Sequence, residues 1–459
     1  MIAIRSLAGQ EVGVFGLARS GLASLRALKE GGARVYCWDD REEARAQGEA
    51  EGARAVAWND WPWQRLKAVV LSPGIPLTYP APHAVVSRSR EAGVMVIGDM
   101  ELFAREIGSS SPVIAVTGTN GKSTTTALIG HILEAAGYKA EIGGNIGKPA
   151  LDLDPPEART VYVLEVSSYQ IDLAPSLRPA MGVLTNITPD HIDRHGSLEA
   201  YAAVKARLIE QSASTVMGID DSQSAALFTR LSATGKSAAP VSVGKVLGRG
   251  VFVLDGVLYD SQGARSDRIC DLKEAAHLPG AHNWQNAALA YAAVKPWAKD
   301  TRAVASALMD FPGLAHRIED VGRIGHVRFV NDSKATNADA AQRALVCFDD
   351  IYWIAGGRAK EGGIDSLAVY FPRIAKAYLI GEAAAAFART LEGKVAYEMS
   401  GTLEAAVAQA LVDAARSEAK APVVLLSPAC ASFDQFKDFE QRGDAFRAAV
   451  AKLAMKEAS

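Results

Sequence analysis

Cysteine is scarce in this chain of 459 residues, and neither sign of charge dominates it. The four cysteines lie far apart and form no Cys-x-x-Cys pair, which is typical of reduced thiols in a cytoplasm. The formal net charge of −3 lacks the basic excess of nucleic-acid-binding proteins. No apolar run approaches the roughly 20 residues of a membrane span, and the opening segment lacks the apolar core of a signal peptide. These absences predict a soluble cytoplasmic protein of enzyme size, with no nucleic-acid partner and no membrane span.

The length and the pattern of apolar runs predict an α/β protein of about three domains. Short apolar runs alternate with helical stretches, which is the pattern of parallel sheets covered by helices. Small polar or Gly-Pro breaks at 108–112 and 311–313 divide this pattern. We therefore expect a Rossmann-like N-terminal domain over 1–108, a central P-loop ATPase-type domain over 109–312, and a Rossmann-like C-terminal α/β domain over 313–459.

The sharpest motif is Gly118-Thr-Asn-Gly-Lys-Ser-Thr124, a compact phosphate loop. It follows a predicted strand over 113–116 and precedes a predicted helix over 124–136. The backbone N–H groups of such a loop, together with a helix N-terminus, cradle phosphate oxygens. Lys122 is placed to neutralise the terminal phosphates, and Ser123 is placed to offer its hydroxyl to Mg²⁺. The motif predicts a nucleotide-binding site.

Two further segments follow strands of the same predicted sheet. Glu165 ends the apolar strand 161–164, beside the phosphate loop, and Mg²⁺ prefers few carboxylates plus phosphate oxygens. His191 and His195 are four residues apart, but no cysteine or third histidine has a spacing that suits zinc. Because open sheets bind ligands at strand carboxyl ends, the His191 segment is a candidate second-metal or substrate site. A capped structural loop is the alternative interpretation.

The first predicted domain carries a glycine-rich turn, Gly13-Val-Phe-Gly-Leu-Ala-Arg-Ser-Gly21, that misses the G-x-G-x-x-G spacing. A nicotinamide or flavin enzyme is therefore disfavoured. Asp39 and Asp40 follow the second predicted strand, where acidic residues grip a ribose or base in nucleotide-binding folds. The loop 72–76 lies at another strand end, which makes it a candidate to line the same cleft. Each of these segments alone is also compatible with an ordinary turn.

The last predicted domain has three loops between strand and helix that carry small, cationic and hydroxyl residues. They are 331–337, 356–363 and 427–434, and together they predict a site for an anion. A helix over 278–294 is expected to close the central domain, and a helix over 435–453 is expected after the last of these loops.

These motifs together resemble the Mur ligase family of ATP-dependent amide-forming enzymes, across all three predicted domains in order. The segments that carry the resemblance are Gly118–Ser123, Gly143–Gly147, Glu165–Gln170, Asp190–Arg194, His282–Asn286, His316–Arg317, Asp332–Asn337 and Ser427–Gly443. The stretch 220–268 matches little of the family pattern.

The resemblance implies an activity as well as a fold. The member that this chain most resembles joins D-glutamate to UDP-N-acetylmuramoyl-L-alanine in cytoplasmic peptidoglycan precursor synthesis. The resemblance implies ATP as phosphoryl donor, two Mg²⁺ ions, an acyl-phosphate intermediate and a monomeric enzyme.

The resemblance also implies roles for individual residues. ATP would be bound by Gly118, Thr119, Asn120, Gly121, Lys122, Ser123, Thr124, Asn286, Arg317 and Asp332. The metal ions would be held by Ser123, Glu165, His191 and a carbamylated Lys205, and these last three with Lys122 form the catalytic set. The UDP portion would contact Leu17, Ala18, Asp39, Asp40, Arg41 and Gly74, and the muramoyl portion Asn145 and His191. D-Glutamate would contact Thr336, Lys360, Ser432, Phe433 and Phe439.

Two other classes remain open from the sequence. A related ligase, such as a folylpolyglutamate synthase or another Mur enzyme, would share the ATP site and differ in the outer domains. A P-loop protein that binds or hydrolyses ATP without a carboxylate substrate would not need the strand-end loops of both outer domains.

Overall fold

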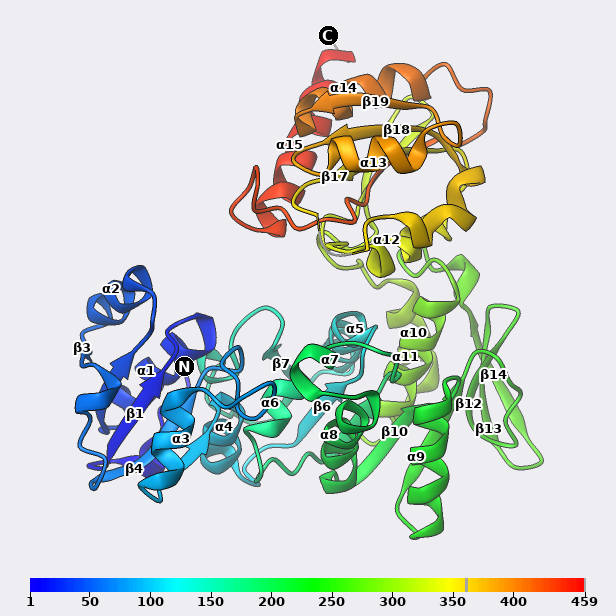
Figure 1. Ribbon diagram of the computed structural model, residues 1–459. Helices are drawn as coiled ribbons and strands as arrows, with labels where there is room; N and C mark the ends of the chain where they lie inside the picture. Colours follow the sequence, from blue (N-terminus) through cyan, green and yellow to red (C-terminus); the bar gives the residue numbers. More distant parts are fainter. Residues whose placement is uncertain (360–361, 458–459) are drawn as a thin grey trace. The chain divides into compact units, whose positions relative to one another are not determined.

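The computed structural model describes residues 1–359 and 362–457 (Figure 1). The chain divides into two compact units, Met1–Ala275 with Asn283–Asp310, and Ala276–His282 with Phe311–Ser459. Three sheets are present in the described residues, and helices connect their parallel strands. The predicted α/β class is therefore confirmed. In the part of the chain that is described, no helix is both long and apolar enough to cross a membrane.

The first sheet is parallel throughout and has the order β3-β2-β1-β4-β5. Gly13 in β1 is required by packing, because a Cβ atom there would overlap the indole ring of Trp61. The order reverses direction between β1 and β4, and such a switch point opens a crevice at the strand carboxyl ends. Its strands are β1 (Glu11–Phe15), β2 (Arg34–Trp38), β3 (Arg54–Ala55), β4 (Leu66–Leu71) and β5 (Met95–Ile97). Its helices are η1 (Arg5–Leu7), α1 (Arg19–Glu30), α2 (Glu42–Ala50), η2 (Trp58–Asp60), α3 (Ala84–Glu91) and α4 (Asp99–Ile107).

The second sheet has nine strands in the order β14-β13-β12-β11-β10-β9-β6-β8-β7. Pairing is parallel from β7 to β12 and antiparallel from β12 to β14. Its strands are β6 (Val113–Thr117), β7 (Lys139–Gly144), β8 (Thr160–Glu165), β9 (Met181–Leu184), β10 (Ser214–Gly218), β11 (Ala238–Ser242), β12 (Arg249–Leu254), β13 (Val257–Gln262) and β14 (Ser266–Asp271). Its helices are α5 (Lys122–Ala135), η3 (Ala150–Asp152), α6 (Ser168–Asp172), α7 (Ile192–His195), α8 (Leu198–Gln211), α9 (Ser222–Ala233), η4 (Leu272–Glu274), α10 (Ala281–Val294) and α11 (Thr301–Met309).

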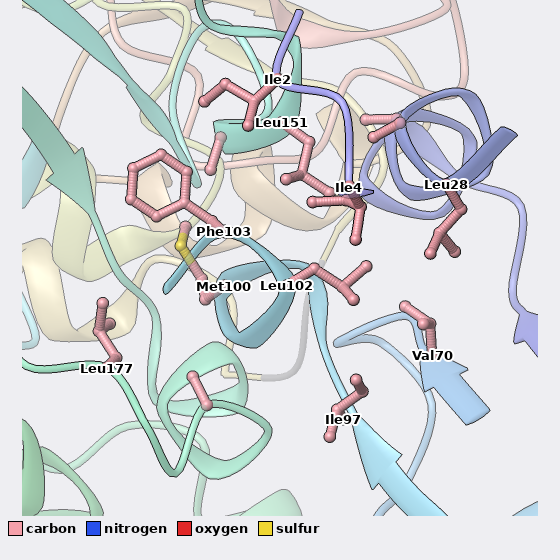
Figure 2. Packing of buried hydrophobic residues seen from close by; sticks show 14 of the residues in the cluster. Ile2, Ile4, Leu28, Val70, Ile97, Met100, Leu102, Phe103, Leu151 and Leu177 are labelled. Carbon is pink, nitrogen blue, oxygen red and sulfur yellow. The ribbon is translucent and has the colours of Figure 1, made fainter. Parts of the chain in front are cut away.

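A shared apolar core joins the first two sheets within one unit (Figure 2). Ile2 and Ile4 pack with Leu151 and Phe103, and the Ile2 amide donates to the Leu151 carbonyl at 2.8 Å. Phe103 of α4 meets Tyr162 of β8 edge to face, with ring centroids 5.1 Å apart. Burial of these side chains from both sheets favours a fixed arrangement of the two strand-end regions.

The third sheet forms the core of the second unit, in the order β15-β16-β20-β17-β18-β19. Only β15 runs antiparallel to its neighbour among the described strands of this sheet. Apolar clusters cover both faces, as expected for a parallel sheet with helices on each side. Its strands are β15 (Glu319–Ile324), β16 (Val327–Asn331), β17 (Ile351–Gly356), β18 (Ile374–Ile380), β19 (Tyr397–Gly401) and β20 (Val423–Leu426). Its helices are α12 (Ala338–Leu345), η5 (Asp365–Arg373), α13 (Ala384–Leu391), α14 (Leu403–Ala414) and α15 (Phe439–Glu457).

Two predicted helices begin later than the sequence analysis expected. The helix predicted over 278–294 starts at Ala281, because Pro279 and a left-handed Gly280 (φ 84°) precede it. The helix predicted over 435–453 starts at Phe439, because the Asp438 carboxylate accepts a hydrogen bond from the Gln441 amide at 2.7 Å and caps it.

Candidate active site

The phosphate loop connects β6 to α5, and its glycines are required where they stand. Gly118 has φ 143° and Gly121 has φ 84°. A Cβ atom on Gly118 would overlap the Thr185 hydroxyl, and one on Gly121 would overlap the Asn286 side chain. The Thr119 amide donates to the Asn186 carbonyl at 2.8 Å, so the loop is also tied to the segment that follows β9.

Lys122 folds back over the phosphate loop. Its Nζ donates to the carbonyls of Gly118 at 3.0 Å and Thr119 at 2.8 Å. The Asn120 amide donates to Asn186 Oδ1 at 3.0 Å, and Thr124 is buried in the first turn of α5. The ammonium group therefore lies beside the backbone that the sequence predicts to cradle phosphates.

Ser123, Glu165 and Asn145 meet at the ends of the strands β6, β7 and β8. The Ser123 hydroxyl donates to Glu165 Oε2 at 2.6 Å, and Asn145 Nδ2 donates to Glu165 Oε1 at 2.8 Å. Glu165 is 3% exposed. A buried carboxylate beside a hydroxyl supplies hard oxygen donors, and this chemistry suits Mg²⁺. Within residues 1–359 and 362–457, no group of three or more His, Cys, Asp or Glu side chains is arranged to hold a metal ion.

Lys205 of α8 reaches the same loop from the other side. It is 1% exposed, and its Nζ donates to the Gly118 carbonyl at 2.8 Å. It also lies over the Tyr201 ring, 4.5 Å from the centroid. Burial and the nearby Lys122 charge hold the pKa of Lys205 well below its usual range. The side chain is thus a buried amine whose charged form is less favoured than that of an exposed lysine.

His191 stands at the start of α7 in a left-handed conformation, with φ 53°. Its Nδ1 lies 2.8 Å from the Tyr169 hydroxyl, and its Nε2 lies 3.4 Å from Asp190 Oδ2. Burial lowers the pKa of His191 from its ordinary value. The neighbouring His195 contacts the Ser168 hydroxyl through Nε2 at 2.9 Å. The two histidines therefore have separate partners in α6.

In the first sheet, Asp39 organises the turn after β1. Its carboxylate accepts from the Leu17 amide at 2.7 Å and from the Arg41 amide at 2.9 Å. Burial alone would raise the pKa of Asp39, but these hydrogen bonds and the Arg41 guanidinium lower it below its ordinary value. Asp40 instead pairs with His83 Nε2 at 3.3 Å. Ala18 is the N-cap of α1 in the same turn.

The second unit contains its own buried polar centre at Asp332. The Ser427 hydroxyl donates to Asp332 Oδ2 at 2.8 Å, and the Ile318 amide donates to Oδ1 at 3.2 Å. Burial raises the pKa of Asp332 to about 7, against the opposing effects of Ser427 and the Arg317 charge. Asn286, a further predicted ATP residue outside the loop, lies in the first unit, where it accepts from the Thr125 hydroxyl at 3.3 Å.

The predicted D-glutamate residues have different environments within the second unit. Ser432 is 2% exposed, whereas Phe433 is 62% exposed. Thr336 is half-buried, and Lys360 lies outside the described residues. Phe439 lies under the Lys334 ammonium, 5.2 Å from the ring centroid.

Several polar residues of these sites were missed by the sequence analysis. Arg442 is 1% exposed and donates to the Ser333 hydroxyl at 3.0 Å and the Cys430 carbonyl at 3.1 Å. Asn186 and Tyr169 also contact predicted site residues. Their positions inside quoted motifs were the available signal, but their partners depend on the fold.

Comparison with known proteins places the chain in one family. The Mur ligase middle domain matches residues 116–294, and the Mur ligase glutamate ligase domain matches residues 316–430. A protein of Phenylobacterium zucineum (strain HLK1) named UDP-N-acetylmuramoylalanine–D-glutamate ligase is 53% identical over 463 residues, covering 99% of this chain and 98% of the relative. A protein of the same name from Nitrobacter winogradskyi is 54% identical over 460 residues, covering 99% and 98%.

Solved structures share the fold at low identity. A UDP-N-acetylmuramate-alanine ligase from Thermotoga maritima has a TM-score of 0.60 at 17% identity, covering 96% of this chain and 99% of that chain. A pseudomurein peptide ligase type C from Methanothermus fervidus has a TM-score of 0.56 at 16% identity, covering 97% and 100%. From the matched domains and the full-length relatives, the chain belongs to the Mur ligase family.

Proposed function

We propose that this chain catalyses the ATP-dependent joining of D-glutamate to UDP-N-acetylmuramoyl-L-alanine in peptidoglycan synthesis. The observation that carries the proposal is the 53% identity, over 99% of the chain, to a relative named for that reaction. The phosphate loop with its buried Ser123–Glu165 pair supports the ATP-dependent part. The alternative is a Mur-type ligase that uses another amino acid or another acceptor, and an assay of ADP release distinguishes the two.

The residues of the phosphate loop would bind and orient ATP. The turn from Gly118 to Gly121, with the N-terminus of α5 directly after it, would present backbone N–H groups to phosphate oxygens. Lys122 holds a positive charge at this position, where negative charge on the transferring phosphoryl group must be stabilised. Asn286, Arg317 and Asp332 would hold the rest of the nucleotide.

The donor set at this site fits Mg²⁺. Ser123 and Glu165 would hold one ion, and His191 with a carbamylated Lys205 would hold the second. When bound, Mg²⁺ screens phosphate charge and polarises phosphoryl oxygens. Oxygen donors from a hydroxyl, a carboxylate and a carbamate match the preference of this hard cation.

Carbamylation of Lys205 is supported by its surroundings. The neutral amine attacks CO₂, a C–N bond forms, and one proton is released, which leaves an anionic carbamate. Burial and the Lys122 charge favour the neutral amine that this reaction needs. An ammonium group at the same place would repel a bound cation.

The reaction would proceed through an acyl phosphate. A carboxylate oxygen of the L-alanyl group attacks the γ-phosphorus, and the bond to ADP breaks. The D-glutamate amine then attacks the acyl carbon, phosphate leaves with the carboxylate oxygen, and the nitrogen loses a proton. Asn145 and His191 would position the L-alanyl end. The UDP portion would lie against Leu17, Ala18, Asp39, Asp40, Arg41 and Gly74. D-Glutamate would lie against Thr336, Lys360, Ser432, Phe433 and Phe439.

The domain limits, the oligomeric state and the location are also proposed. Three domains over 1–108, 109–312 and 313–459 would each contain one of the three sheets. All assigned residues belong to one chain, which supports a monomer that light scattering can test. Substrates made from UDP and ATP support a cytoplasmic location, which fractionation can test.

ADP release tests the proposed reaction directly. With ATP and Mg²⁺, we expect release only when UDP-N-acetylmuramoyl-L-alanine and D-glutamate are both present, with one amide product per ADP. L-Glutamate and other amino acids, supplied one at a time, serve as controls. A rate of ADP release that does not depend on either substrate would instead identify a P-loop ATPase.

A further inference from the structure

Tyr169 of α6 is a half-buried residue to which the proposed reaction assigns no role. Its hydroxyl lies 2.8 Å from Nδ1 of His191. Its ring stacks on His195, with centroids 5.6 Å apart and planes inclined by 18°. The Arg194 guanidinium lies 4.6 Å from the centroid of the same ring. One side chain therefore contacts three residues of the α7 segment.

The helix that carries Tyr169 is fixed by a buried polar network. Gln170 Oε1 accepts from both the amide and the hydroxyl of Ser167 at 3.2 Å, which completes a capping box. Gln170 Nε2 donates to Asp99 Oδ2 at 3.1 Å, and Asp99 is 2% exposed at the start of α4. The Gln170–Asp99 contact ties α6 to α4, although Asp99 Oδ1 is buried without a hydrogen-bond partner among the described residues. Tyr169 thus extends from a fixed backbone.

Arg194 continues the arrangement to the first sheet. Its Nη1 donates to the Gly74 carbonyl at 2.8 Å and its Nη2 to the Ile75 carbonyl at 3.2 Å. Both carbonyls belong to the loop that follows β4, where the UDP portion is proposed to bind. A guanidinium over an aromatic face is attracted to the ring. Tyr169 therefore lies between that loop and His191.

A phenolic hydroxyl can both donate and accept a hydrogen bond. It can hold His191 Nδ1 in either neutral tautomer, donating when Nε2 carries the proton and accepting when Nδ1 does. In both tautomers the Tyr169 hydroxyl engages Nδ1, whereas Nε2 lies 3.4 Å from Asp190 Oδ2.

We propose that Tyr169 is a positioning residue of this enzyme, whose hydroxyl orients the His191 ring and whose ring holds Arg194 against the Gly74 and Ile75 carbonyls. Only the kinetic part of this inference rests on the proposed function. The orientation of His191 is a property of the chain alone and can be measured without substrate or metal.

The first test reads the His191 ring by NMR in the full chain with ¹⁵N-labelled histidine. His191→Gln identifies its resonances. Tyr169→Phe removes only the hydroxyl, and we expect it to shift both His191 ring nitrogens while those of His131 and His326 stay unchanged. Tyr397→Phe is the matched control, because it removes a hydroxyl bonded to Glu392 at 2.6 Å in the other unit. Superimposable His191 resonances in Tyr169→Phe and the parent would overturn the proposal.

The second test separates the two functions of the side chain kinetically. Tyr169→Phe should lower kcat about tenfold and change the KM for ATP by less than about twofold. Tyr169→Leu also removes the ring, and it should additionally raise the KM for the nucleotide-sugar substrate. A Tyr169→Phe enzyme with unchanged kcat would contradict the positioning role. If Tyr169→Leu fails to fold, Tyr169→Phe and the NMR comparison still test the positioning role. Absence of ligase activity in the parent enzyme would refute only the proposed function.

Discussion

The phosphate loop of the first unit and the Asp332 region of the second unit both follow strand ends, yet they hold their charges differently. Around the loop, each charged group has a close polar partner, as in the Ser123–Glu165 contact at 2.6 Å. In the second unit, Asp332 is buried with a pKa raised to about 7 by burial, and Phe433, in the same loop as the Asp332 partner Ser427, is 62% exposed. The first region gathers Lys122, Lys205 and Glu165 around one loop, whereas the second buries a carboxyl whose pKa is raised.

This difference separates the expected consequences of substitution. Preorganised groups around transferring phosphate act mainly on the chemical step. Groups in an amino-acid site act mainly on binding, and a buried carboxyl that resists ionisation acts on stability. Substitutions in the two regions should therefore change different measured quantities, and by different amounts.

The largest effect is expected for Lys122→Ala. Removing the ammonium that lies on the phosphate loop should lower kcat by at least about a hundredfold, because charge on the transferring group loses its partner. Lys299→Ala, a substitution of an exposed lysine in the same unit, is the matched control. ADP release and circular dichroism report activity and folding. Activity within about tenfold of the parent would remove Lys122 from the catalytic set.

Lys205→Ala should also lose most activity, and small carboxylates such as acetate or formate should restore part of it. The added anion would replace the oxygen donors of the proposed carbamate. Lys205→Arg should stay inactive under the same conditions, because it keeps a positive charge. Lys122→Ala, which small carboxylates should not rescue, is the control. If small carboxylates also fail to restore activity to Lys205→Ala, Lys205 is an unmodified buried lysine.

In the second unit, Lys360→Ala should raise the KM for D-glutamate about tenfold with little change in the KM for ATP. The physical reason is the loss of a cation that is proposed to face one carboxylate of the amino acid. Arg358→Ala, two positions earlier in the sequence, is the control. Equal increases in both KM values would assign Lys360 to the nucleotide site.

The smallest effect concerns stability near Asp332. Its folded pKa of about 7 lies above the unfolded value near 3.8, so the folded state binds more protons between these values. Stability of the second unit should therefore fall as pH rises from 4 to 7, by about 1.4 kcal/mol per pH unit at most. Asp332→Asn keeps the shape and should flatten this dependence in urea unfolding. An unchanged pH slope in Asp332→Asn would contradict the raised pKa.

The sequence predicted the parts of the site that follow from strand-end position. Ser123 and Glu165 follow adjacent strands, so their contact could be expected from the parallel sheet alone. Tyr169 could not be assigned in this way, because its partner His191 is 22 residues away and depends on the left-handed start of α7. Arg442 was missed because its place inside the Ser427–Gly443 motif does not show that its side chain is buried, and its partner Ser333 is 109 residues away.

An oxygen-tracing experiment tests the central claim most directly. The L-alanyl carboxylate of the nucleotide-sugar substrate is labelled with ¹⁸O at both oxygens, and the products of ligation with ATP and D-glutamate are analysed by mass spectrometry. Because phosphate departs with one former carboxylate oxygen, we predict one ¹⁸O in each released phosphate and one in each amide carbonyl. Phosphate free of label, released as the amide forms, would contradict activation of the carboxylate by phosphoryl transfer.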